Sequence, residues 1–454
     1  MKILILCLIL CLTSEAAKIL FVIPTPSISH QVVFRPLYQE LARRGHDVTV
    51  ITTDPAFPKG ETPGNLTEID VHEISYNEWR HQILNAETTS GDKNELYNQA
   101  RTVFNIVAKC FEKQMQTAEI QKLIKNKVKF DLLILEAFAK PALSLTHVFK
   151  APTILMSSFG SIRDELSQIG APTNPKLLYP YCLHQRVYNL TIWEKIETIY
   201  KVYRIERFFN IEMIFYNIHS IWETNRPVPP NVVYIGGIHK RPSKELPKVS
   251  PNLFCKIFGT NVSPSQLPKE KIQIFVKVFS QLPYDVLWKW DADKLEGKTD
   301  NIRIEKWLPQ SDLLKHPKIK LFITQGGLQS TDEAFIAGVP MIGIPMFGDQ
   351  CRLKLSNKKI TFFSYRRNVE KLRSVMEDQP QSALDRAVWW AEHVIKHGGA
   401  RHLRAPTANM SWIEYLDLEL LSVVLLTLST VITLAVVILV KIVSLLLSSK
   451  IKVD

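Results

Sequence analysis

The stretch Trp307–Gln350, WLPQSDLLKHPKIKLFITQGGLQSTDEAFIAGVPMIGIPMFGDQ, decides the fold. Its β-rich apolar run Ile319–Thr324 predicts a buried parallel strand, which Gln325-Gly326-Gly327 breaks. The helix that follows ends at Gly338, a residue typical of helix C-termini, and the run 339–344 begins another strand. A strand, a glycine turn, a helix and a strand in this order predict an α/β fold with parallel strands.

The glycine turn is also a candidate anion site. Ser330 and Glu333 stand at the spacing of a capping box, which predicts that the helix opens there. Free N–H groups and the positive end of the helix dipole would then point at one spot, and this suits a phosphate. Many αβ loops carry a Gly-Gly pair for packing alone, so the turn by itself leaves both interpretations open.

A second α/β unit opens the chain. Lys18–Ile23 and Val48–Thr52 have strand patterns, and Val32–Arg44 between them has a helix pattern. His30 falls in the loop at the carboxyl edge of the first strand, where open α/β sheets bind ligands. A helix N-terminus disfavours the imidazolium, so His30 is expected to stay neutral and available as a base. An ordinary residue at the start of a helix is the alternative.

The strand-like run Phe130–Glu136 ends in an acid. A carboxylate at that sheet edge could meet His30 and hold its Nδ1–H, which is the arrangement that orients a catalytic base. A solvated acid at the end of a strand explains the pattern equally well.

Length and composition favour two domains. A chain of 454 residues with 46% apolar content exceeds one ordinary domain. The polar, proline-spaced run 239–251 is typical of a linker, which divides an N-terminal domain at 17–238 from a C-terminal domain at 239–412. The net charge of +12 is spread along the chain without a dense basic block, and this argues against nucleic-acid binding.

Both ends of the chain carry membrane-targeting patterns. Residues 1–16 have the early lysine, apolar run and small residues of a signal peptide. Leu420–Val440 lacks any charge and forms about 31 Å of helix, enough to cross a bilayer. Lysines follow it, so the tail 441–454 is expected in the cytosol and the body in the lumen. Lys450 and Lys452 resemble a dilysine signal for return to the endoplasmic reticulum, or they merely stop transfer.

Together these residues resemble the donor site of the UDP-glycosyltransferases, and most closely their membrane-anchored insect branch. The donor-site pattern is matched by FITQGG (322–327), Ser330, Glu333, PMI (340–342), PM (345–346) and Asp349-Gln350. Ser29-His30, the run 130–136, Trp389-Trp390 and the C-terminal anchor extend the likeness along nearly all of the mature chain. The resemblance implies the GT-B fold, which is two Rossmann-like domains facing a cleft, with one C-terminal transmembrane helix.

The resemblance implies a role for each candidate residue. Trp307 would stack on the uracil with Gln310 beside it, and Glu333 would bind the ribose hydroxyls. The pyrophosphate would be bound by Gln325, Gly326, Gly327 and Ser330, and the transferred sugar by Asp349 with Gln350. His30 would be the base that deprotonates the acceptor hydroxyl, and Glu136 would support it.

The implied activity is an inverting transfer of a sugar, expected to be glucose, from a UDP-sugar to a hydroxyl of small lipophilic acceptors, as in detoxification by conjugation. No metal or other cofactor is implied, since N–H groups at a helix start stabilise the charge on departing UDP. The implied partners are the donor, the acceptor and the bilayer of the endoplasmic reticulum, and homo- or hetero-oligomers stay open. Sequons at Asn65, Asn189, Asn261 and Asn409 permit glycosylation.

This chain departs from the family pattern in several places. Gln325 stands where many relatives have His, and Glu136 stands where vertebrate members have Asp. The chain also looks short near 203–213, 247–256 and 351–366, and Lys256 replaces a residue expected to be buried in the first strand of the donor domain. These short regions motivate the alternative, a non-catalytic or partner-dependent luminal member of the same family.

Overall fold

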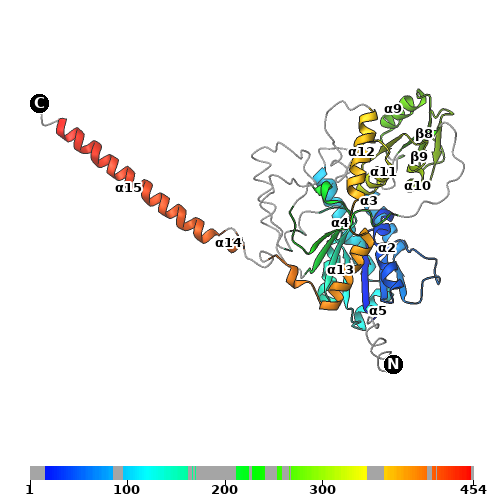
Figure 1. Ribbon diagram of the computed structural model, residues 1–454, viewed down its shortest axis with the longest axis horizontal. Coiled ribbons are helices and arrows are strands. Elements are labelled where there is room, and N and C mark those ends of the chain that lie inside the picture. The colour runs from blue at the N-terminus through cyan, green and yellow to red at the C-terminus, as the bar shows by residue number, and fades with distance from the viewer. Residues whose placement is uncertain are drawn as a thin grey trace. The chain divides into compact units, whose positions relative to one another are not determined.

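The computed structural model describes residues 16–84, 96–161, 166, 169, 211–223, 227–240, 253–257, 265, 267–344, 362–405, 412–415 and 417–450. The chain divides into two compact units, Met1–Arg404 and Ala405–Asp454, and each is described by itself (Figure 1). The expected signal peptide and linker lie almost wholly outside the described residues. Three of the four sequons do so entirely.

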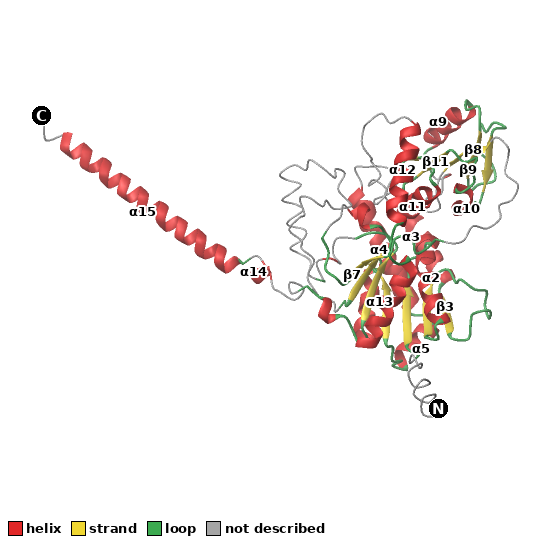
Figure 2. Cartoon of the chain, in the orientation of Figure 1, coloured by secondary structure: helices red, strands yellow, loops and turns green. Residues whose placement is uncertain are grey.

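The first sheet of the larger unit has seven parallel strands in the order β3-β2-β1-β4-β5-β6-β7. Their bounds are Lys18–Ile23 (β1), Asp47–Thr52 (β2), Leu66–Asp70 (β3), Leu132–Glu136 (β4), Thr153–Ser157 (β5), Met213–Tyr216 (β6) and Val232–Tyr234 (β7). Every residue of β4, β5 and β6 is buried, because helices cover both faces of the sheet (Figure 2). The predicted parallel α/β fold is confirmed.

Helices pack on both faces of this sheet and make two core clusters. One face carries α2 (Ile28–Arg43) together with α13 (Ala383–His397) from much later in the chain. The other face carries α4 (Leu96–Met115) and α5 (Ala118–Lys125). The remaining helices of this half are α3 (His72–Leu84), α6 (Leu145–Phe149) and the 3-10 turns η2 (Lys140–Ser144) and η4 (Ser220–Glu223).

Helix α2 begins four residues earlier than its apolar pattern suggests. Ser27 is extended, with φ of −155°, and its carbonyl accepts the N–H groups of His30 (2.9 Å) and Gln31 (3.2 Å). These bonds start the helix at Ile28, so the expected loop position of His30 is wrong. His30 lies in the first turn of α2, still at the carboxyl edge of β1.

The second sheet has five parallel strands in the order β10-β9-β8-β11-β12. Their bounds are Leu253–Ile257 (β8), Asp285–Lys289 (β9), Ile302–Glu305 (β10), Leu321–Thr324 (β11) and Met341–Gly343 (β12). The run around Lys256 was expected to make a poor strand, but β8 forms at the centre of the sheet. The irregularity that it carries is a register shift between Leu253 and Cys255.

The helices of the second half are α9 (Lys269–Ser280), α10 (Gln310–Leu314), α11 (Leu328–Ala337) and α12 (Phe362–Glu377). The sequence of residues 351–368 shows no clean helix or strand period, so α12 is not predicted. The apolar residues Val369 and Leu372 of α12 are one helical turn apart and pack beside Phe335 of α11. Two apolar residues are too short a pattern to predict a helix from the sequence. The domain boundaries proposed from the linker stay a prediction.

The second unit contains α14 (Trp412–Tyr415) and α15 (Leu418–Lys450). Within the span Leu418–Leu445 of α15, a stretch of 18 residues has a mean hydropathy of 2.9, and none of that stretch is buried. A helix of this length and composition can cross a membrane, and it contains the predicted span 420–440.

Candidate active site

His30 and Glu136 meet at the carboxyl edge of two neighbouring strands. β1 and β4 run in parallel, β1 leads through a short turn into α2, and Glu136 is the last residue of β4. Nδ1 of His30 contacts Oε1 of Glu136, whose side chain is fully buried, while 13% of the His30 side chain is exposed. A carboxylate oxygen accepts hydrogen bonds, so this contact favours the tautomer with the hydrogen on Nδ1 and a lone pair on Nε2.

Two further groups hold this pair. The backbone N–H of Thr25 donates to Oε2 of Glu136 over 3.1 Å, so both carboxylate oxygens are engaged. The hydroxyl of Ser158 lies 3.2 Å from Nδ1 of His30 and is 6% exposed. Neither residue is predicted from the sequence. The available signal is that Ser158 follows β5 directly, at the same sheet edge as Glu136.

Aromatic rings form an apolar wall beside the imidazole. Phe138 and Phe159 meet the His30 ring edge-on, with centroids 5.3 and 5.7 Å away. Phe104 of α4 lies 5.1 Å from Phe138. The spacing of Phe104 along its helix predicts a core position, but the side chain is only partly buried and lies next to the aromatic group at His30. The phenyl rings give the imidazole an apolar border, and pockets lined by such rings bind apolar molecules.

On the second sheet, β11 leads through Gln325, Gly326 and Gly327 into α11. Gly326 has φ of +88°, which favours glycine, and its N–H donates to Oγ1 of Thr324 over 3.2 Å. Gln325 is buried. Gly327 is the N-cap of α11, with no side chain to occupy the space over the first turn. The first N–H groups of a helix have no partner within it, so this end of α11 can receive an anion.

The predicted capping box of Ser330 and Glu333 is wrong. Gly327 has non-helical angles (φ −59°, ψ 143°) and its carbonyl accepts the N–H of Thr331 over 3.0 Å, so the helix opens at Leu328. Ser330 and Glu333 therefore lie inside α11, three residues apart. Both accept from Nε2 of Gln310 at the start of α10, at 3.0 Å for Ser330 Oγ and 2.7 Å for Glu333 Oε2. The structure thus joins three residues expected at the donor site.

Trp307 lies in the segment between β10 and α10, and 63% of it is exposed. The ammonium of Lys289 lies 5.7 Å from the centre of the indole ring. Burial lowers the pKa of Lys289, and nearby Asp291 acts in the opposite direction. Because most of the indole of Trp307 is exposed, this ring is available to stack on another aromatic ring. Asp349 and Gln350, the expected sugar-binding pair, lie outside the described residues.

The start of α11 also meets the first sheet within the larger unit. Leu328, its first residue, packs against the second core cluster of the first sheet, and Phe335 lies 4.8 Å from Trp222 by ring centroids. Between them Asp332 is buried, and burial raises its pKa to about 7, with Lys240 acting against the shift and Glu333 adding to it. Its Oδ1 has no hydrogen-bond partner within the described chain.

In the part of the chain that the structure describes, no group of three or more histidine, cysteine, aspartate or glutamate side chains is arranged to hold a metal ion. The polar groups of the site are instead carboxylates, amides, hydroxyls, one imidazole and the N–H groups at the start of α11.

Two parallel sheets covered by helices, with polar side chains at their carboxyl edges, define the class of fold to which this protein belongs. A solved structure described as UDP-glucose: anthocyanidin 3-O-glucosyltransferase in complex with UDP has the same fold, with a TM-score of 0.57 and 15% identity. The match covers 85% of this chain and all of that one. The protein has the GT-B fold of glycosyltransferases, as predicted.

The particular family follows from the sequence. The pattern of the family described as UDP-glucoronosyl and UDP-glucosyl transferase matches residues 17–220, 212–359 and 353–453. The chain belongs to this family, and it is an enzyme that transfers a sugar from a UDP-sugar.

Two relatives show the range of the family. The ecdysteroid UDP-glucosyltransferase of Spodoptera littoralis nuclear polyhedrosis virus is 30% identical, over 91% of this chain and 95% of the relative. Human UDP-glucuronosyltransferase 2B7 is 27% identical, over 89% of each chain. The viral alignment extends over 490 positions, more than the 454 residues of this chain. The segments of the family match overlap at 212–220, which begins within the short region 203–213, and at 353–359, which lies within the short region 351–366.

Proposed function

We propose that this enzyme transfers glucose from UDP-glucose to a hydroxyl group of a small lipophilic acceptor, with inversion at the anomeric carbon. The observation that carries the proposal is the contact between Nδ1 of His30 and the buried Glu136, with Phe138 and Phe159 against the same imidazole. A base held by a carboxylate and bordered by apolar rings fits the deprotonation of a hydroxyl on an apolar molecule.

The proposed reaction is one displacement. Nε2 of His30 takes the proton of the acceptor hydroxyl, and the acceptor oxygen forms a bond to C1 of the sugar. The bond between C1 and the phosphate oxygen breaks on the opposite face, and UDP leaves with the electron pair. Glu136 stabilises the imidazolium that forms. N–H groups of the glycine turn and of α11 stabilise the charge on UDP, without a metal ion or another cofactor.

The donor residues are assigned in the same proposal. Trp307 stacks on the uracil, and Glu333 binds the ribose hydroxyls with Gln310 beside it. The pyrophosphate lies against Gln325, Gly326, Gly327 and Ser330, and Asp349 with Gln350 binds the sugar. The bonds from Gln310 to Ser330 and Glu333 support the assignment, because they hold three of these side chains at one place.

Glucose and a lipophilic acceptor are favoured by the relatives together with the apolar wall. The viral relative is named an ecdysteroid UDP-glucosyltransferase, so its acceptor is a hydroxylated lipophile, whereas the human relative is named for glucuronic acid. Conjugation of such molecules serves detoxification. We place the body of the enzyme in the lumen of the endoplasmic reticulum, with α15 as its anchor and a cytosolic tail.

Glycosylation of the body is part of this proposal, but Asn65 is poorly suited to carry a glycan. Its Nδ2 donates to the carbonyl oxygens of Ala42 and His46, the latter over 3.0 Å. A glycan on this nitrogen would require both bonds to be given up, so modification is expected at the other three sequons.

The test measures UDP release by microsomes that contain the full chain. A phenolic acceptor is added together with one donor at a time, which is UDP-glucose, UDP-glucuronic acid or UDP-N-acetylglucosamine. His30→Ala is expected to lower the rate with UDP-glucose by at least about 10²-fold, the usual contribution of a general base. His147→Ala, an exposed histidine on α6, serves as the control and should keep the wild-type rate.

Equal rates of wild type and His30→Ala with all three donors would overturn the proposed catalysis. Thermal stabilisation by UDP alone then separates the alternatives, because a non-catalytic member that still binds the nucleotide gains stability with UDP. That alternative is motivated by the regions in which the chain looks short.

A further inference from the structure

We propose that Gln31 is a positioning residue for His30 and Glu136, acting through the backbone of Thr25. This inference rests on the proposed function, since it concerns the same base and its carboxylate. Gln31 follows His30 directly in α2, but the two side chains point in different directions, because consecutive residues of a helix are about 100° apart. His30 is partly exposed, whereas Gln31 is fully buried.

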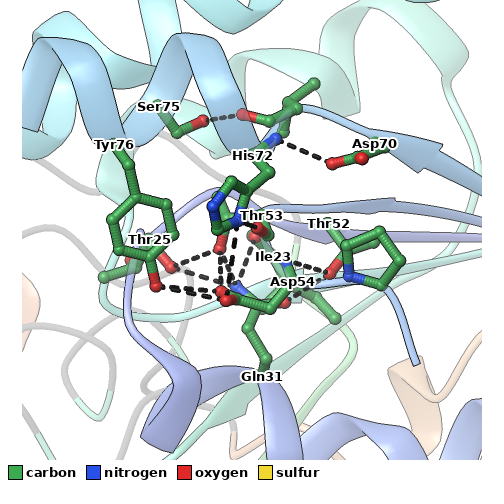
Figure 3. A network of polar contacts seen from close by, with 12 residues as sticks. Ile23, Thr25, Gln31, Thr52, Thr53, Asp54, Asp70, His72, Ser75 and Tyr76 are labelled. Carbon is green, nitrogen blue, oxygen red and sulfur yellow. Dashed lines mark hydrogen bonds and ion pairs between the residues drawn. The ribbon is translucent and has the colours of Figure 1, made fainter. Parts of the chain in front are cut away.

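The amide of Gln31 joins the ends of β1 and β2 (Figure 3). Its Nε2 donates to the carbonyl oxygens of Ile23 and Thr25, both at 3.0 Å, and lies 2.9 Å from Oγ1 of Thr53. Its Oε1 accepts from the hydroxyl of Thr52 over 2.7 Å. Both ends of the amide are satisfied, so removing either one leaves a buried polar group without its partner.

Thr25 connects this amide to the active site. Its carbonyl accepts from Gln31 and its N–H donates to Oε2 of Glu136, while Oε1 of the same carboxylate contacts His30. The contacts close a ring that runs from His30 to Glu136, to Thr25, to Gln31 and back to His30 along the helix. The position of the Thr25 N–H, and with it the angle at which Glu136 meets Nδ1, therefore depends on Gln31.

This arrangement has a consequence for catalysis. Catalytic groups must be held within a fraction of an ångström, and misplacement by about 1 Å costs on the order of 10²-fold in rate. If the Gln31 amide is lost, the turn between β1 and α2 loses its bond to Thr25 and Glu136 can rotate away from Nδ1. The base then spends less time in the tautomer that leaves Nε2 free.

The chain offers a matched control in Gln114 of α4. Gln114 is also fully buried, and its Nε2 donates to the carbonyl of Pro24 over 2.7 Å and to Oγ of Ser75 over 2.8 Å. It therefore binds the same turn one residue earlier than Gln31 does. It makes no contact within the ring, so its loss should weaken the fold without turning Glu136.

The experiment compares Gln31→Met and Gln114→Met in the full chain. Both should lower the melting temperature to a similar extent. In Gln31→Met, kcat should fall on the order of 10- to 100-fold and the pH profile of kcat should shift, while KM for UDP-glucose stays within about twofold. In Gln114→Met, kcat should stay within about threefold of wild type and the pH profile should not move.

Either of two results would overturn the inference: an unchanged kcat and pH profile in Gln31→Met, or equal losses of kcat in both variants. If Gln31→Met does not fold, Thr52→Val replaces it, because this isosteric change removes the hydroxyl that donates to Gln31 and that accepts from the N–H of Asp54. It should lower kcat a few-fold at constant KM, and an unchanged kcat would contradict the inference. Wild-type activity in His30→Ala would instead refute the proposed function, so the two failures are distinguishable.

Discussion

The two sides of the site are built differently. On the proposed base side, Glu136 is fully buried, and its carboxylate contacts His30 of α2 and accepts from the N–H of Thr25 in the turn after β1. On the donor side, Trp307 is 63% exposed, and Gln310 spans α10 and α11 to reach Ser330 and Glu333. The Glu136 carboxylate is thus held by groups of the protein itself, whereas the proposed donor side exposes a large aromatic ring.

This difference suggests how the two sides contribute to kinetics. Groups that are fixed before the reaction act on the transition state and appear in kcat. Groups that close on a ligand contribute binding energy and appear mainly in KM or in the dissociation constant of UDP. Substitutions on the two sides should therefore change different quantities.

The largest effect is expected from Glu136→Gln. The amide keeps the size of the carboxylate but cannot accept at both positions, so it no longer selects the Nδ1–H tautomer or stabilises the imidazolium. We expect kcat to fall on the order of 10³-fold, with KM for UDP-glucose nearly unchanged, in steady-state assays of UDP release. Glu136→Asp is the control, since it keeps the charge and should retain much more activity. A rise in KM without a loss of kcat would break the comparison.

A smaller effect is expected from Trp307→Ala on the donor side. Stacking of a base on an aromatic ring contributes about 1–3 kcal/mol, so the dissociation constant of UDP should rise roughly 5- to 150-fold. Titration calorimetry with UDP measures this directly, and kcat at saturating donor should stay within a few-fold of wild type. Trp307→Phe keeps a smaller aromatic ring, so its dissociation constant for UDP should lie between those of wild type and Trp307→Ala. Unchanged UDP affinity in Trp307→Ala would remove the indole from the donor site.

Local sequence patterns predicted those structural features that depend on residues close together in the chain. The strand, glycine turn and helix around 321–337 are found as expected, because a short apolar run and a left-handed Gly338 act over a few residues. The sequence left open whether Glu136 meets His30 or is a solvated acid, and the structure shows the contact, because the carboxyl ends of neighbouring parallel strands share one edge. The catalytic and binding roles of these residues stay predictions.

The features that the sequence did not predict depend on contacts between residues that are far apart in the chain. Gln31 falls outside the helix predicted at Val32–Arg44, and its burial depends on contacts with the ends of β1 and β2. The four-residue strand β6 and helix α12 have apolar patterns too short to recognise. The capping box at Ser330 was wrong because Gly327 caps the helix with its backbone alone.

The smallest effect concerns Asp332, which lies next to Glu333 on the donor side and has a pKa raised to about 7 by burial. An unfolded aspartate has a pKa of about 3.9, so the folded state holds this proton over a range in which the unfolded state has released it. Its contribution to stability is therefore full below about pH 4 and is lost as the pH rises through about 7. The amide side chain introduced by Asp332→Asn cannot ionise, so this pH dependence disappears in the variant.

Melting temperatures of wild type and Asp332→Asn between pH 5 and 8 test this, and their difference removes the titration of all other groups. The variant should gain about 2–4 °C on wild type as the pH rises across this range. Parallel curves would show that Asp332 keeps one protonation state throughout, with Lys240 holding its charge. The predicted divergence would sharpen the comparison, because it would place a group that titrates near neutral pH beside Glu333, where the donor is proposed to bind.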